Sequence, residues 1–189
     1  RIVRELQVGL SAARFRGFCE SSAEFMVLVD DDNVLSPNYL AEVLLEFASH
    51  PKVGLLGGPC VGEFEQQPAP WAMEFLPLLA LRDFGNSILI SLAFDGQVER
   101  RYPAFAPIGA GMAIRRDAIA SWMNAYTAGQ CSLTDRLGSS LTSAGDNDIV
   151  LHALSSGWGV GYFPALRVLH LIPGQRLNAD YLARLNRGI

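Results

Sequence analysis

The sequence predicts an α/β protein with a mostly parallel sheet flanked by helices. Short apolar runs occur at residues 25–29, 53–59 and 160–163, and such runs are typical of buried strands. Apolar residues at helical spacing follow residue 36 and again follow residue 146. Because strands and helical stretches alternate along the chain, we expect helices to cross over between parallel strands of one sheet.

Length and composition indicate one packed globular domain. At 189 residues, half of them hydrophobic and 18% charged, the chain can build a core and does not have the composition of a disordered segment. The net charge of −4 gives no general affinity for polyanions, so we expect no nucleic-acid partner. Cys19, Cys60 and Cys131 are odd in number and widely spaced, which argues against a disulfide framework and favours a cytoplasmic location.

No uninterrupted apolar run reaches the roughly 18–20 residues of a membrane span. The nearest approach, at residues 71–94, is broken by charged residues and proline, and we expect it to form core and the acceptor wall of a site. The alternative is a peripheral membrane contact, because Trp71, Phe75 and Phe84 are aromatics of the interfacial type. The chain starts without an apolar signal segment or an initiator Met, so we expect a fragment or a processed piece.

The first element is a loop that feeds a helix, at residues 8–19. Its small residues allow close packing, and Arg14 and Arg16 are available for phosphate. A solvated helical face is an equally good interpretation of the two arginines.

The strand at residues 25–29 runs directly into three carboxylates, Asp30, Asp31 and Asp32. Ser36-Pro37 then resembles an N-cap followed by proline at the first helical position. The carboxyl end of a strand is where open α/β sheets place their ligands. Three crowded acids repel one another, and a divalent cation with a preference for oxygen, Mg²⁺ or Mn²⁺, relieves that repulsion and binds substrate phosphates as well. A solvated acidic turn is the alternative.

The remaining elements follow from turn signals and spacing. We expect loops at residues 63–70, 94–107 (with a turn at Asp95-Gly96) and 127–143. A small, apolar, glycine-rich stretch at residues 108–114 allows a ligand or another backbone to approach closely. We expect helices at residues 116–125, 146–156 and 178–186, with Gly157 as a C-cap, and strands at residues 160–163 and 166–169.

Four segments occur in an order and spacing typical of one enzyme family. They are residues 9–17 (GLSAARFRG), Asp30-Asp31-Asp32 with Pro37, residues 109–116 (GAGMAIRR), and residues 146–149 (DNDI) eleven positions before Gly157-Trp158. They look like G-x-x-x-A-R-N-x-G with Phe15 in place of Asn, the DXD-containing F-L-D-D-D-x-x-x-x-P, G-x-x-M-x-x-R-R, and E-D-x-[DE]-L…A-G-[WY]. Over nearly its whole length the chain therefore resembles the family-2 glycosyltransferases of the GT-A fold.

The resemblance implies a metal-dependent enzyme that moves a sugar from a nucleotide-diphosphate donor to a saccharide or lipid-linked acceptor, with inversion. It implies Mn²⁺ or Mg²⁺ on Asp32, with Asp30 and Asp31 near the ribose and the metal's water shell, and Arg14 on the donor side. The implied setting is cell-envelope or exopolysaccharide synthesis, in the cytoplasm or at the inner face of the membrane.

The resemblance also assigns the acceptor side and the base. It places Gly109, Ala110, Gly111 and Met112 on the acceptor side and makes Asp146 the catalytic base, and a helix N-terminus stabilises a carboxylate there as the anion. The Glu that precedes this Asp in the family is Gly145 here, so Asp148 is the fallback base. His170, in a match to x-H-x-x-P, is either a metal or diphosphate ligand or a core histidine.

The family's opening strand, V-S-V-I-I-P-x-Y-N, is not found in the sequence. We therefore expect residues 1–189 to form a single glycosyltransferase domain truncated at its N-terminus. Together with Gly145, this favours an alternative function as a non-catalytic or truncated binding module. A metal-dependent phosphohydrolase or nucleotidyltransferase is a weaker third interpretation.

Overall fold

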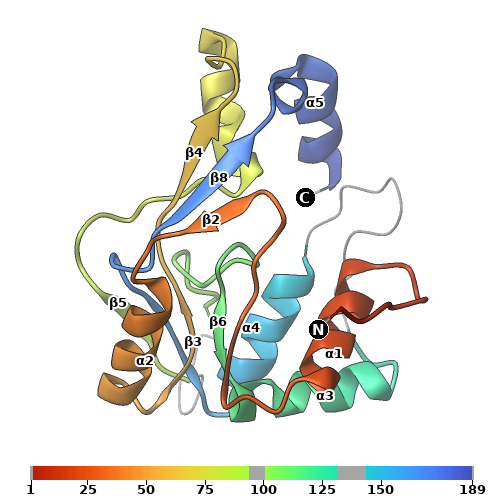
Figure 1. The fold of residues 1–189 in the computed structure, drawn as a ribbon, viewed down its shortest axis with the longest axis vertical. Coiled ribbons are helices and arrows are strands. Elements are labelled where there is room, and N and C mark those ends of the chain that lie inside the picture. The colour runs from red at the N-terminus through yellow and green to blue at the C-terminus, as the bar shows by residue number, and fades with distance from the viewer. Residues whose placement is uncertain (1, 94–100, 132–143, 189) are drawn as a thin grey trace.

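The computed structural model describes residues 2–93, 101–131 and 144–188, which form two sheets with helices packed against them (Figure 1). The first sheet has five strands in the order β1-β6-β3-β7-β5 and the second has three in the order β2-β8-β4. The strands are β1 (Phe25–Val27), β2 (Asn33–Leu35), β3 (Val53–Gly57), β4 (Cys60–Phe64), β5 (Leu89–Ser91), β6 (Ala113–Arg115), β7 (Gly159–Tyr162) and β8 (Val168–Ile172).

Five α-helices and three 3₁₀ segments are present in the described residues. The α-helices are α1 (Leu10–Glu20), α2 (Tyr39–Ser49), α3 (Ala120–Thr127), α4 (Gly145–Ser155) and α5 (Ala179–Gly188). The 3₁₀ segments are η1 (Pro70–Leu79), η2 (Arg116–Ile119) and η3 (Gly174–Leu177). None of the helices in the described ranges is long and apolar enough to cross a membrane.

The α/β class is confirmed, but the expectation of a mostly parallel sheet is wrong. Among the strands of the described residues, only β3–β7 and β4–β8 pair in parallel. β1, β3 and β7 do run in one direction, as crossover helices require. However, β6 lies antiparallel between β1 and β3, with Ile114 opposite both Met26 and Leu55, and β5 lies antiparallel on β7. The sequence pattern predicts β1, β3, β7 and β8, but it does not predict the short strands β2, β4 and β5. It also does not show which strand will insert between two others.

Alternate residues of the central strands point to opposite faces of the five-stranded sheet, as the pleat requires. Leu55 and Ile114 pack with α3 and α4, whereas Leu56 and Ala113 pack with α2. α2 therefore covers one face of this sheet, and α1, α3 and α4 cover the other (Figure 1).

The carboxylates are followed by a strand before the helix begins. β2 comes directly after Asp32, and α2 begins at Tyr39 with Asn38 as the cap residue. The prediction of Ser36 as N-cap is wrong. The Ser36 hydroxyl is buried with no hydrogen-bond partner among the described residues, and the Ser36 carbonyl accepts a hydrogen bond from the Tyr39 amide in a turn.

The buried face of α2 is narrower than its spacing of apolar residues suggests. Tyr39, Val43 and Phe47 are almost fully buried, at i, i+4 and i+8. Leu40 and Leu44, which the helical pattern groups with them, remain 60% and 55% exposed.

The three-stranded sheet carries a second, smaller core. Ile172 of β8 packs with Leu79 of η1 and with Leu182 and Leu185 of α5. This arrangement brings the C-terminal helix close to the segment at residues 70–79, which forms the other wall of the cavity described below.

Most other sequence-predicted elements are present. The helix expected at residues 116–125 is η2 followed by α3, and Gly157, at φ 93°, ends the turn after α4. The final helix is α5, and β8 begins two residues later than expected and contains His170. The Asp95-Gly96 turn and residues 132–143 of the expected loop lie outside the described residues.

Candidate functional site

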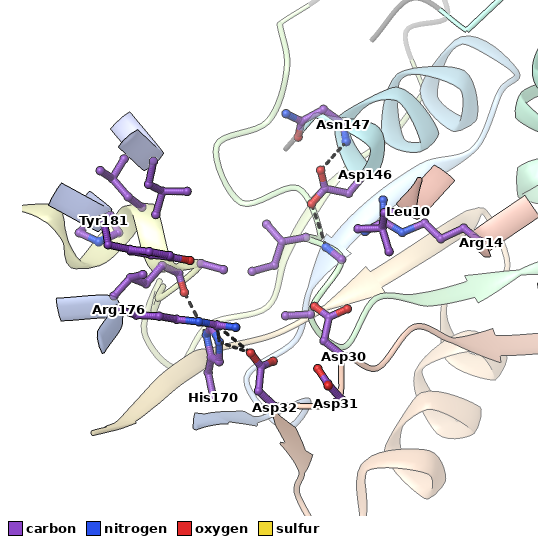
Figure 2. Close-up of a pocket in the computed structure, with 18 of the residues that line it drawn as sticks. Leu10, Arg14, Asp30, Asp31, Asp32, Asp146, Asn147, His170, Arg176 and Tyr181 are labelled. Carbon is purple, nitrogen blue, oxygen red and sulfur yellow. Dashed lines mark hydrogen bonds and ion pairs between the residues drawn. The ribbon is translucent and has the colours of Figure 1, made fainter. Parts of the chain in front are cut away.

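A cavity of about 540 Å³ lies where the two sheets meet (Figure 2). Its walls come from segments far apart in the sequence: the start of α1, the β1–β2 turn, η1, the residues before β6, the start of α4, β8, η3 and α5. The lining residues are Gly9, Leu10, Arg14, Asp30, Asp31, Asp32, Pro77, Leu78, Leu79, Ala80, Ile108, Gly109, Ala110, Asp146, Asn147, His170, Arg176, Tyr181 and Leu185.

The three carboxylates occupy the turn between β1 and β2, at the junction of the two sheets. The Asn33 amide donates to the Asp30 carbonyl at 3.1 Å, which closes the turn. The Leu171 amide donates to the Asp32 carbonyl at 2.8 Å and joins the turn to β8. The backbone at Asp32 is therefore fixed against the strand that carries His170.

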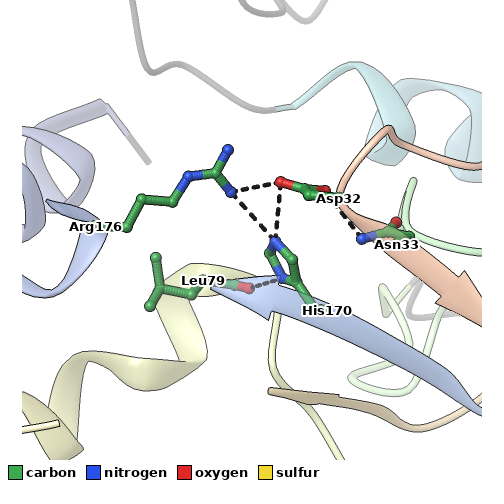
Figure 3. A network of polar contacts seen from close by, with 5 residues as sticks. All are labelled: Asp32, Asn33, Leu79, His170 and Arg176. Atoms are coloured by element: carbon green, nitrogen blue, oxygen red, sulfur yellow. Dashed lines mark hydrogen bonds and ion pairs between the residues drawn. The ribbon is translucent and has the colours of Figure 1, made fainter. Parts of the chain in front are cut away.

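Asp32 and His170 converge on one point with Arg176 (Figure 3). Arg176 Nη1 lies 2.7 Å from Asp32 Oδ2 and 3.2 Å from His170 Nε2. The two acceptor atoms are 3.3 Å apart. On the far side of the ring, His170 Nδ1 is 3.0 Å from the Leu79 carbonyl oxygen.

This donor set is compatible with a divalent cation. A carboxylate oxygen and an imidazole nitrogen are both used as Mn²⁺ ligands, and here they already face a shared positive charge. Within the described ranges, no group of three or more His, Cys, Asp or Glu residues is placed to hold a metal. A cation at Asp32 and His170 would therefore take its other ligands from water and phosphate, as Mg²⁺ commonly does.

Asp146 faces the same cavity from the first turn of α4. The Gly109 amide donates to its Oδ2 at 2.9 Å, and the Asn147 amide donates to its Oδ1 at 3.0 Å. Arg14 approaches the same point: a Cβ on Gly109 would lie 2.5 Å from Arg14 Nη2 and 3.7 Å from Asp146 Oδ2. Arg14, the Gly109 backbone and the Asp146 carboxylate are thus packed together at the cavity wall; Figure 2 shows the Arg14 and Asp146 side chains there.

Two further contacts support this wall, and the sequence reasoning missed both. The Tyr102 hydroxyl donates to Asn147 Oδ1 at 2.6 Å. Arg82 Nη1 and Nη2 donate to the carbonyls of Ala106 and Ala104, and burial lowers the pKa of this guanidinium from its usual value. Arg82 therefore braces the segment that leads to Gly109.

The structure separates the two candidate bases. Asp148 is 3% exposed and does not line the cavity; its Oδ2 accepts a hydrogen bond from Trp122 Nε1 at 3.1 Å. Asp148 also contributes, after burial, to raising the pKa of Cys131 to about 11. The fallback assignment of Asp148 as a base is therefore corrected: it is a core residue on the opposite side of α4 from Asp146.

Of the four residues expected on the acceptor side, two line the cavity and two do not. Gly109 and Ala110 line the cavity. Gly111 and Met112 do not: Gly111 has φ 79° and its carbonyl accepts a hydrogen bond from the Tyr39 hydroxyl, while Met112 is fully buried in the core. These two residues serve the packing beneath the cavity rather than its surface.

The sequence reasoning brought Arg14, Asp30, Asp31, Asp32, Asp146 and His170 into one site, and all six line the cavity. Residues 71–94 were expected to form a wall of the site, and Pro77, Leu78 and Leu79 of this stretch do line the cavity. Arg176 and Tyr181 were not expected there. The only available signal for Arg176 was its place six residues after His170, beyond a proline.

Comparison with known proteins agrees with this arrangement. A family model described as "Glycosyltransferase like family 2" matches residues 1–189. The chain belongs to this family. A search of the curated proteins found no match.

Among solved structures, the crystal structure of GalNAc-T7 with UDP, GalNAc and Mn²⁺ matches with a TM-score of 0.51 and 15% identity. The match covers 97% of this chain and 35% of that one, so this chain spans about a third of that relative's length. The family-2 chain therefore has a GT-A fold, as its sequence motifs predict.

Proposed function

We propose that this family-2 domain is a metal-dependent inverting glycosyltransferase. It would move a sugar from a nucleotide-diphosphate donor to a saccharide or lipid-linked acceptor. The observation that carries the proposal is that one cavity of a GT-A fold contains a possible cation site, Asp32 with His170, and a separate backbone-anchored carboxylate, Asp146.

The donor side is the end of the cavity at the β1–β2 turn. Asp32 and His170 would hold Mn²⁺ or Mg²⁺, whose charge stabilises the leaving diphosphate. Asp30 and Asp31 line the same end of the cavity, near the ribose and the water shell of the cation in this proposal. Arg14 lines the cavity beside Gly109 and would add a positive charge on the donor side.

Asp146 would act as the base. Its two oxygens each accept one backbone hydrogen bond, and these bonds fix the orientation of the carboxylate toward the cavity. As the acceptor oxygen forms its bond to the anomeric carbon, Asp146 takes the hydroxyl proton. The bond from the anomeric carbon to the phosphate oxygen breaks on the opposite face, so the configuration inverts.

The donor and the cellular setting extend this proposal. The GalNAc-T7 structure contains UDP, GalNAc and Mn²⁺, so UDP-sugars are the first donors to test. Trp71 and Phe84, 46% and 40% exposed, support a peripheral membrane contact near the acceptor wall. We place the enzyme in cell-envelope or exopolysaccharide synthesis, in the cytoplasm or at the inner face of the membrane.

The test is release of nucleoside diphosphate from UDP-, GDP- and dTDP-sugars with Mn²⁺, in the presence of a saccharide acceptor panel. We expect turnover with one donor, loss of turnover in EDTA, and loss in Asp32→Asn and Asp146→Asn. Asp117→Asn, an exposed acid on η2, is the matched control and should keep wild-type turnover.

The same assay separates the alternatives. A protein whose melting temperature rises with Mn²⁺ and nucleotide but that transfers no sugar would be a binding module, which Gly145 favours. Release of phosphate or pyrophosphate in place of nucleoside diphosphate would indicate a phosphohydrolase or nucleotidyltransferase. Wild-type turnover in folded Asp146→Asn would refute the base assignment.

A further inference from the structure

The side chain of Arg176 contacts both residues of the candidate cation site, Asp32 and His170. It reaches from η3 across the cavity, and its Nη1 touches both Asp32 Oδ2 and His170 Nε2 (Figure 3). The side chains of Asp32 and Arg176 are 21% and 27% exposed, and that of His170 is 9% exposed. Three polar groups are thus gathered in a partly buried place where each needs a partner.

The hydrogen-bond directions show that Arg176 Nη1 is the shared donor to Asp32 and His170. His170 Nδ1 faces the Leu79 carbonyl, which can only accept, so the ring proton lies on Nδ1 in the neutral tautomer. Nε2 then carries a lone pair. Asp32 Oδ2 also only accepts, so the 3.3 Å between Oδ2 and Nε2 is not a hydrogen bond in that tautomer. Both atoms are instead acceptors for the one cationic group between them, Arg176 Nη1.

We propose that Arg176 occupies the position of the divalent cation in the free protein and moves to the donor's diphosphate when that cation binds. This inference rests on the proposed function of the site. Two lone-pair donors arranged around a positive nitrogen are also arranged for a metal ion, but the metal and the guanidinium cannot both hold that position. Charge repulsion from the metal drives the guanidinium outward.

When the Arg176 guanidinium leaves Asp32 and His170, it can remain inside the cavity. Arg176 lines the cavity, and its backbone is held because the neighbouring Leu177 is buried in the small core with Leu182 and Leu185. The side chain therefore moves while its anchor stays. A planar guanidinium matches phosphate oxygens in a bidentate way, so the leaving diphosphate is a suitable new partner. Cation and diphosphate would then bind more tightly together than either does alone.

Binding of Mn²⁺ can be measured from the loss of the electron paramagnetic resonance signal of free Mn²⁺. This measurement tests the proposed movement of Arg176 without any turnover. Arg176→Met removes the competing charge, so it should bind Mn²⁺ alone more tightly than wild type by roughly tenfold, the order of one charge-assisted hydrogen bond. Adding inorganic pyrophosphate should tighten Mn²⁺ binding in wild type and much less in Arg176→Met. Arg176→Lys keeps a positive charge and should restore the weak binding of Mn²⁺ alone.

The control is Arg187→Met, which removes an exposed arginine from the end of α5 and should match wild type in both measurements. Asp32→Asn in the Arg176→Met background should abolish the gain. Melting curves show whether each variant is folded.

If Arg176→Met binds Mn²⁺ alone with equal or weaker affinity than wild type, the proposed exchange of Arg176 for the cation is overturned. In that case, sugar transfer by the wild-type protein would still support the proposed function. If no variant binds Mn²⁺, the exchange is also overturned. A melting shift with UDP in EDTA would then show whether a donor site exists without metal.

Discussion

Gly109→Ala tests the wall that holds Asp146, and its effect can be worked out from the packing. The new methyl group would lie 2.5 Å from Arg14 Nη2, whereas ordinary contact begins at 3.4 Å, so the two must separate by about 0.9 Å. The same methyl group would lie 3.7 Å from Asp146 Oδ2, an ordinary contact, so the Arg14 guanidinium moves and Asp146 keeps its hydrogen bond from the Gly109 amide. Arg14 lies on the donor side in the proposed function, and a misplacement of about 1 Å in such a site can cost roughly a hundredfold in rate, so we expect kcat to fall by about that factor.

Stability should change little, and this contrast makes the test specific. The crowded atom is the tip of a flexible arginine, so we expect Gly109→Ala to lose under about 1 kcal/mol of unfolding free energy, a shift in Tm of about 2–4 °C. Gly17 lies on α1, and no atom in the described part of the chain lies within 4 Å of an added methyl group, so Gly17→Ala should be active and more stable by about 1 kcal/mol. Gly54→Ala presses on Ala118 and Trp158 and should lose about 1–3 kcal/mol.

The assay is nucleoside diphosphate release with the donor and acceptor found in the panel, alongside thermal melts of all three variants. A folded Gly109→Ala protein with wild-type kcat would refute the reasoning, because it would show that the position of the Arg14 guanidinium beside Gly109 does not matter for transfer. A loss of kcat that tracks a loss of folded protein would refute it as well.

Three other predictions concern the core and the donor site. Asp148→Ala leaves Trp122 Nε1 buried without a partner, so urea titration should show a loss of about 1–3 kcal/mol while turnover per folded molecule persists; loss of turnover in folded protein would contradict this. Burial raises the pKa of Cys60 from 9.0 to about 11. As the pH rises, the unfolded chain loses this proton first, so the free energy of unfolding falls between pH 9 and 11. Cys60→Ala should show a shallower fall in urea titrations, and a fall equal to that of wild type would refute the assignment. Asp32→Asn should lose the Mn²⁺-dependent rise in melting temperature with UDP, whereas Asp117→Asn should keep it.

Local patterns predicted the elements well because their causes are local. The strand that leads into Asp30–Asp32, the helix that begins near Asp146 and the turn at Gly157 all follow from apolar periodicity and glycine placement. The GT-A architecture came from motif order rather than from physics. The site residues of those motifs converged because the fold brings the β1–β2 turn, the start of α4 and β8 to one cavity.

Contacts between distant segments were the main source of error. Insertion of β6 between β1 and β3 depends on pairing across more than fifty residues, which no local pattern encodes. The convergence of Arg176 on Asp32 depends on the path of the chain after His170. The error at Asp148 was avoidable in part: residues two apart on a helix lie on nearly opposite sides, so Asp146 and Asp148 could not share one site, although the fold was needed to tell which one faced it.

The placement of β6 has a consequence for how the chain acquires its structure during synthesis. When the ribosome has released β1 and β3, the strand that will join them is still more than fifty residues away from emerging. Both strands then present open edges, and open edges invite pairing with other chains. Each central pairing of this sheet also closes a long loop, so we expect slow folding of high contact order, and an increased need for chaperones until Ala113–Arg115 becomes available.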